Sequence, residues 1–209
     1  MNIKKTASFL INFTLNRLAE IFGIIITLAG ISLFISLFSY SPDDPNFIFP
    51  QNAEIKNLLG FHGSFVSDLF FQSIGLIAYL ISFTLIATGY NILRTKDFFL
   101  IIENIFYSIL YIIFGSLFFS HYYSDAFTLY INGNGGFVGN YFNQTFLGSI
   151  IFINEILAYY ILIIAVIALF LISINFHPLK VYKSILKIFN YFSKKENKSY
   201  TDKSELISE

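Results

Sequence analysis

Four long apolar segments alternate with polar segments along the chain. A membrane-spanning helix needs about 20 mostly apolar residues, because each residue advances the helix by about 1.5 Å and the hydrocarbon core is about 30 Å thick. Each apolar segment approaches or exceeds that length and holds few charges. The pattern therefore predicts an all-α membrane protein, a four-helix transmembrane bundle, with spans at about 21–38, 69–93, 98–119 and 156–176.

The first apolar segment ends at the heptapeptide 39–45, Ser-Tyr-Ser-Pro-Asp-Asp-Pro. Pro42 and Pro45 cannot continue a helix, because proline lacks an amide proton and clashes with the preceding turn. Asp43 and Asp44 cannot remain in hydrocarbon. The heptapeptide is therefore expected to lie in water at one face of the membrane.

Shorter patterns complete the organisation between the spans. Residues 57–68 are apolar but too short to cross a membrane, which favours a re-entrant or interfacial helix. Glu155 divides a long apolar stretch, so residues 146–154 are interpreted as an amphipathic or re-entrant lead-in to the fourth span.

Two polar connections are also predicted. Residues 132–140 are rich in Gly and Asn, which predicts a loop with tight turns. The short polar turn 94–97 makes the second and third spans an antiparallel hairpin.

Small residues within the apolar segments indicate where two helices can approach closely. Gly75, Ala78 and Ser82 are spaced i, i+3 and i+7, so they share one face of a helix. The candidate helix-packing positions are Gly23, Gly30, Gly75, Ala78 and Ser82.

Composition and charge distribution support a membrane protein and predict its orientation. Only 12% of the residues are charged and the mean hydropathy is +0.67, whereas soluble domains average about 25% charged residues. Of the 13 Lys and Arg residues, all but Lys56 precede the first span, lie between the second and third, or follow the fourth. Because cytoplasmic loops carry the excess of Lys and Arg, both termini are expected in the cytoplasm.

The same pattern divides the chain into three parts. Residues 1–20 form a cytoplasmic N-terminal segment, and residues 21–178 form the four-span membrane domain. In residues 179–209, lysines recur at helical spacing on one face, opposite apolar residues. This predicts a basic juxtamembrane amphipathic helix on an anionic membrane surface, followed by a disordered tail or linker.

The sequence contains no pattern that indicates catalysis, a metal site or a cofactor. It has no Cys, which excludes a thiolate nucleophile and a Cys-ligated metal. No G-x-x-x-x-G-K-[ST] sequence is present to hold ATP phosphates, and Val138 breaks the dinucleotide pattern that begins at Gly133. His62 and His121 lack the spacing of a zinc site. We expect no enzymatic activity and no cofactor.

Glu103 and Glu155 are the carboxylates nearest to membrane depth. Both lie near predicted span ends, where a carboxylate can reach water, so they are interpreted as interfacial anchors rather than a proton relay. The alternative function is a small transporter or channel subunit. That alternative requires a polar path through the bundle, with Glu103, Glu155 or Asn154 facing inward.

Several motifs resemble those of a known family. They are the heptapeptide 39–45, the N-x-x-G-x-x-G run at 57–63, the D-x-x-x-Q-x-x-G run at 68–75, and Gly-Gly-Phe-Val-Gly at 135–139. Together with the four spans, they resemble the N-terminal four-transmembrane domain of the FtsK/SpoIIIE family of bacterial DNA translocases. The resemblance extends over residues 17–176.

The resemblance implies a role in the bacterial inner membrane. Members of the family anchor a hexameric cytoplasmic ATPase at the division septum, where it pumps DNA during chromosome segregation. This chain carries no motor sequence, so the resemblance implies a non-catalytic membrane anchor and scaffold. Either it is the membrane part of a longer protein, or the membrane part is encoded separately. DNA and ATP are then reached only through a motor domain.

The resemblance also implies partners, namely membrane lipids, other division proteins and further copies of the chain. The two outer loops are the surfaces expected to contact division proteins. Their candidate contact residues are Pro42, Asp43, Asp44, Pro45, Gly60, Gly63, Gly135, Gly136 and Gly139.

Overall fold

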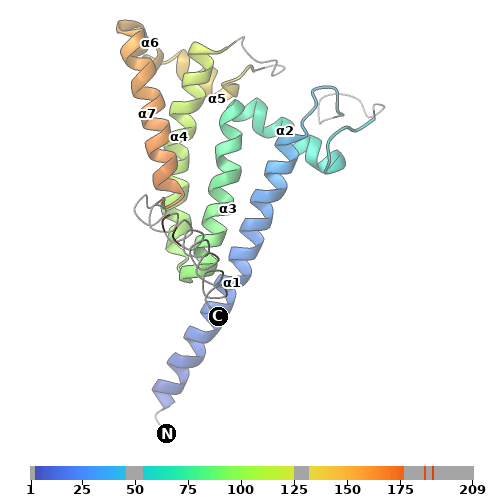
Figure 1. Ribbon diagram of the computed structural model, residues 1–209, viewed down its shortest axis with the longest axis vertical. Coiled ribbons are helices and arrows are strands. Elements are labelled where there is room, and N and C mark those ends of the chain that lie inside the picture. The colour runs from blue at the N-terminus through green and yellow to red at the C-terminus, as the bar shows by residue number, and fades with distance from the viewer. Residues whose placement is uncertain (1–2, 46–53, 125–131, 177–185, 187–189, 191–209) are drawn as a thin grey trace, which may run out of the picture. The chain divides into compact units, whose positions relative to one another are not determined.

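The computed structural model describes residues 3–45, 54–124 and 132–176, together with residues 186 and 190 (Figure 1). The chain divides into two units, Met1–Asn175 and Phe176–Glu209. The predicted basic amphipathic helix and tail fall in the second unit and lie outside the described residues, apart from Leu186 and Asn190.

The described residues fold into helices and contain no strand, which confirms the all-α class. Four stretches are long and apolar enough to cross a membrane: Ser8–Phe38, Gly60–Thr95, Phe99–Tyr122 and Glu155–Ser173. The elements in order are α1 (Ile3–Phe38), α2 (Gly60–Ile74), the 3-10 helix η1 (Gly75–Ile77), α3 (Ala78–Thr95), α4 (Phe99–Tyr122), α5 (Gly136–Asn143), α6 (Phe146–Ile153) and α7 (Glu155–Ser173).

The largest difference from the sequence-based expectation lies in the second span. The prediction placed one helix over 69–93, but the helix is interrupted at η1, so that α2 and α3 run in different directions (Figure 1). Gly75 has φ +66° and ψ −147°, close to a backbone region that is essentially confined to glycine. A Cβ on Gly75 would also lie 1.9 Å from the carbonyl oxygen of Asn134. A contact distant in sequence therefore sets this helix boundary.

The first and fourth spans can also be compared with their predicted bounds. Helix α1 extends well beyond the predicted first span, because it begins at Ile3 and ends at Phe38, where the span was predicted to end. Between α6 and α7, the side chain of Asn154 caps α7 by accepting a hydrogen bond from the Leu157 amide at 3.1 Å. The break between the lead-in segment and the fourth span thus lies immediately before Glu155.

Helices α1 and α3 lie side by side, as do α4 and α7 (Figure 1). The first pair approaches through glycines. A Cβ on Gly23 would lie 2.9 Å from the carbonyl oxygen of Gly89, and a Cβ on Gly30 would lie 2.8 Å from the amide nitrogen of Ile86. Such close backbone approach increases van der Waals contact, which is the main attraction between helices in lipid.

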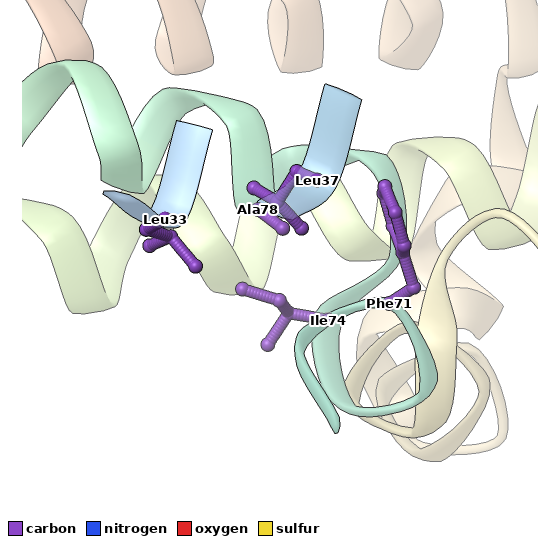
Figure 2. Packing of buried hydrophobic residues seen from close by; sticks show 5 residues of the cluster. All are labelled: Leu33, Leu37, Phe71, Ile74 and Ala78. Carbon is purple, nitrogen blue, oxygen red and sulfur yellow. The ribbon is translucent and has the colours of Figure 1, made fainter. Parts of the chain in front are cut away.

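A buried apolar cluster joins α1, α2 and the start of α3. Its members are Leu33, Leu37, Phe71, Ile74 and Ala78, which converge in Figure 2. Phe71 and Ile74 come from the last turns of α2, so the cluster fixes α2 against α1. A second cluster, which joins α4, α6 and α7, contains Leu117, Phe118, Ile151 and Leu162.

Buried polar side chains link α3, α4 and α7 in pairs. The Thr84 hydroxyl lies 3.0 Å from the Tyr111 hydroxyl and 3.2 Å from that of Ser173. Asn104 donates to the Thr88 hydroxyl at 2.7 Å. All of these hydroxyl and amide groups are buried, and hydrogen bonds between helices offset the cost of placing them there.

Candidate functional site

The candidate site is the end of the bundle formed by residues 39–45, 54–77 and 132–154, which we call the loop end. The opposite end, around the α3–α4 connection 95–99, is called the hairpin end. The loop end contains every motif on which the family resemblance rests. Its geometry shows which motif residues hold the fold and which remain accessible.

Asp44 organises the turn that follows α1. Its carboxylate is 2% exposed and accepts hydrogen bonds from the backbone amides of Lys56 at 2.8 Å and Asn57 at 2.9 Å. Hydrogen bonds to a charged acceptor are stronger than neutral ones, at about 1.5–3 kcal/mol each. Asp44 therefore joins the end of α1 to the segment that leads into α2.

Asn57, the first residue of the N-x-x-G-x-x-G motif, extends this connection. It donates to the carbonyl oxygen of Ser36 at 2.9 Å, and its own side-chain oxygen accepts from the Leu59 amide at 3.0 Å. Ser36 in turn donates to the carbonyl oxygen of Gly63 at 2.5 Å. A Cβ on Gly63 would lie 2.1 Å from the Asn57 side chain, so glycine is required there.

The D-x-x-x-Q-x-x-G motif makes three contacts between separate segments. The Tyr40 hydroxyl donates to Asp68 at 3.3 Å. The Gln72 side chain accepts from the Asn132 amide at 3.2 Å. Gly75 accommodates Asn134, whose carbonyl oxygen accepts from the Leu76 amide at 3.0 Å. The spacing of the motif therefore follows from these contacts, because Asp68 and Gln72 share one face of α2 and Gly75 follows its last residue.

Tyr40 is also the titratable group most affected by this packing. Its ring centroid lies 4.8 Å from that of Phe71. Burial raises the pKa of Tyr40 well above its usual range, and the carboxylate of Asp68 raises it further. Tyr40 is therefore a neutral hydrogen-bond donor at physiological pH.

The glycine-rich segment 132–140 begins with tight turns, as predicted, but from Gly136 it forms the short helix α5 rather than a loop. Gly135, Gly136 and Gly139 are buried, and Gly133 is partly exposed. A Cβ on Gly136 would lie 2.6 Å from the Gly75 amide nitrogen, and a Cβ on Gly139 would lie 2.2 Å from the Ser116 carbonyl oxygen. Gly135 is buried in the same contact with α4. In this structure these three glycines allow α5 to approach α2 and α4. Their contact with a partner protein stays a prediction.

The candidate residues of the first loop fall into accessible and inaccessible groups. Asp43 is accessible: its side chain is 75% exposed and pairs with Lys56 at 3.1 Å. Pro42 and Gly60 are partly exposed, whereas Pro45 and Gly63 are buried along with Asp44.

Two exposed aromatic residues on α5 were missed by the sequence analysis. Phe137 and Tyr141 are 61% and 57% exposed, and their rings stack at a centroid distance of 6.3 Å. Their i, i+4 spacing was the available signal, but it has meaning only once the segment is known to be helical. With Asp43 and the exposed Phe61 of α2, they form the set that we call the loop surface.

The polar side chains that a transport path would need do not face inward. Glu103, Asn154 and Glu155 are all exposed. Glu103 lies on the first turns of α4, Asn154 is the N-cap residue of α7, and Glu155 is the first residue of that helix. The arrangement that the transporter alternative requires is therefore absent from the described residues.

An ion pair ties α1 to the hairpin end, because Lys96 pairs with Glu20 at 2.8 Å.

These features define the class as an all-helical, multi-pass membrane domain with four candidate spans and an ordered loop end. Residues 16–186 match the family model of the four-transmembrane region of DNA translocase FtsK/SpoIIIE. The chain belongs to this family, and the matched region is its membrane part rather than its motor.

Curated relatives agree with this assignment. The chain is 27% identical over 173 residues to the DNA translocase FtsK of Rickettsia typhi, which covers 80% of this chain and 23% of that protein. It is 31% identical over 78 residues to the protein of the same name from Rickettsia bellii, covering 37% of the chain and 10% of the relative. A third relative of that name, from Azospirillum brasilense, is 31% identical over 87 residues, or 41% of the chain and 14% of the relative.

The chain thus spans less than a quarter of the length of these relatives. No solved structure matches it.

Proposed function

We propose that this chain is the non-catalytic membrane anchor of a DNA translocase that acts at the division septum of a bacterial inner membrane. One observation carries the proposal. The family match and the four candidate membrane spans occupy the same part of the chain. The relatives are named DNA translocase FtsK. The role of this chain in chromosome segregation during division is part of the proposal.

The orientation belongs to the same proposal. The hairpin end carries Arg94 and Lys96, and the other basic residues outside the loop end lie toward the two termini. Because positive residues are retained on the cytoplasmic side, the hairpin end faces the cytoplasm and the loop end faces outward. A motor joined to or bound by this chain would then have access to DNA and ATP in the cytoplasm.

The scaffold part of the proposal concerns the loop surface. Asp43, Phe61, Phe137 and Tyr141 are exposed on a frame held by buried hydrogen bonds. Aromatic side chains on an ordered frame are typical of protein contacts, because little conformational freedom is lost on binding. We assign this surface to contact with extracytoplasmic division proteins. Self-association of the membrane domain would hold motor subunits together.

The test uses a fluorescent fusion of the full protein, expressed from its own promoter in dividing cells. The variants are Asp43→Lys and Phe137→Ser, with Phe99→Ser as the control, since Phe99 is also exposed, at 78% against 61% for Phe137, but lies at the hairpin end. We expect a mid-cell band that appears with constriction for the unchanged protein and the control, and a weaker band for both loop variants.

Each part of the proposal has its own contrary result. Uniform membrane fluorescence from the unchanged, folded protein would overturn the septal role. A normal band for both loop variants would leave the anchor intact but remove the function assigned to the loop surface.

A further inference from the structure

An open surface pocket lies between the end of α4 and the start of α7. It has a volume of about 290 Å³ and is lined by Tyr122, Glu155, Ile156, Tyr159 and Tyr160. Its walls are mostly apolar ring and aliphatic surface, and they include three aromatic rings and one carboxylate. Neither the family match nor the proposed function explains this combination, and the motifs of the resemblance include none of these residues.

The rings are held in fixed positions. The Tyr122 and Tyr159 rings are nearly perpendicular, at 88°, with centroids 5.1 Å apart, and Tyr159 and Tyr160 meet at 87° and 5.5 Å. The Tyr122 hydroxyl donates to the backbone carbonyl of Glu155 at 2.7 Å. The Tyr159 hydroxyl lies 2.9 Å from that of Tyr123. These bonds orient two of the rings before any ligand arrives.

The charge in the pocket favours a cation. The lining contains a carboxylate and no basic side chain. Among the described residues, the ion pairs join Arg17 and Lys96 to Glu20 and Lys56 to Asp43, so none of them neutralises Glu155. The faces of aromatic rings attract ammonium groups, and several rings around one ammonium group form an aromatic cage. A carboxylate beside the rings adds direct charge attraction.

The surface next to the pocket indicates where the cation comes from. Ile156, Tyr160, Ile164 and Ile167 follow at i, i+4, i+8 and i+11, so they share one face of α7, and they are 76%, 60%, 65% and 53% exposed. An apolar face on a membrane-spanning helix contacts acyl chains. A ligand that places an ammonium group at the end of the helix and hydrocarbon along this face is a phospholipid.

We propose that this pocket binds the ammonium group of an ethanolamine phospholipid, with the carboxylate of Glu155 as its counter-ion and the tyrosine rings as its walls. The acyl chains lie along the exposed face of α7. The proposal does not depend on the translocase role, so either can fail alone. A competing explanation is that Glu155 only stabilises the N-terminus of α7, where a negative charge is favourable. That explanation predicts no preference among lipids.

The experiment measures lipid binding to the purified full chain by native mass spectrometry. Phosphatidylethanolamine and phosphatidylglycerol with the same acyl chains are titrated separately. The variants are Glu155→Gln and Tyr160→Leu, and the control is Glu103→Gln, which removes an exposed carboxylate at the hairpin end. Helix content by circular dichroism shows whether each variant is folded. If Glu155→Gln does not fold, Tyr160→Leu provides the test of the pocket.

We expect the unchanged chain and the control to bind phosphatidylethanolamine preferentially. Both pocket variants should bind it roughly fivefold to tenfold more weakly, as for the loss of one desolvated cation–π or ion-pair contact. Their phosphatidylglycerol binding should not fall. Equal binding of the two lipids by the unchanged chain, or an unaltered preference in the folded pocket variants, would overturn the proposal.

Discussion

Replacement of Gly89 by Val is expected to separate α1 from α3. A Cβ on Gly89 would lie 2.2 Å from the Thr27 hydroxyl oxygen and 2.6 Å from both the Gly23 carbonyl oxygen and the Thr27 amide nitrogen. The hydroxyl can rotate away, but the backbone atoms cannot. Since ordinary contacts begin near 3.4 Å, the two backbones must move apart by roughly 0.8 Å, a gap that already forfeits a quarter to a half of the local dispersion attraction.

The size of the effect follows from two opposing contributions. Overpacking a close contact costs about 1–3 kcal/mol. Valine is a better helix former than glycine, but this returns only about 0.4 kcal/mol. The expected net loss in the free energy of unfolding is therefore about 0.6–2.6 kcal/mol, which is the overpacking cost less the propensity gain.

The measurement is reversible unfolding of the purified chain in mild detergent, titrated with sodium dodecyl sulfate and followed by circular dichroism. The matched control is Ala168→Val, which adds bulk to an exposed position of α7 and is expected to change the free energy of unfolding by less than about 0.5 kcal/mol. If Gly89→Val is no more destabilising than this control, the close contact between α1 and α3 is not the source of their association.

Three further predictions address the loop end and the buried polar pairs. Asp44→Ala should cost about 2–4 kcal/mol, because the buried amide of Asn57 and the partly buried amide of Lys56 lose a charged acceptor. Asp43→Ala should cost under about 1 kcal/mol, as for an exposed ion pair; similar losses would contradict the assignment. Asn104→Leu should cost about 0.6–1.7 kcal/mol, and Ser108→Ala, which removes a bond within one helix, should cost less. Gly136→Ala should prevent the packing of α5, seen as faster amide exchange there; unchanged protection would refute the contact.

Much of the fold follows from local pattern. Runs of apolar residues predict the four spans, because hydrocarbon admits only segments that satisfy their own backbone hydrogen bonds. The prolines and aspartates at 42–45 predict where the first span stops, and Glu155 marks the start of the last. These inferences need only the chemistry of single residues and short windows, so they can be made without a structure.

The candidate site could be located from the sequence, but its parts could not be assigned. Asp43 and Asp44 are identical neighbours, yet one is exposed and the other accepts two backbone amides. The glycine-rich segment has the composition of a loop, yet from Gly136 onward it is a packed helix. In both cases the outcome depends on partners far away in the sequence, which no local window contains.

The sequence by itself determined that this is a membrane protein with four apolar helices, a polar stop after the first, and the motifs of a translocase membrane domain. Only the tertiary structure decided that the second span is interrupted at Gly75, that Gly89 faces α1, and that a carboxylate and three tyrosine rings share one pocket. The physical reason is the range of the interactions. Burial in hydrocarbon depends on each residue and its immediate neighbours, whereas close packing and hydrogen-bond pairing depend on which helix faces meet.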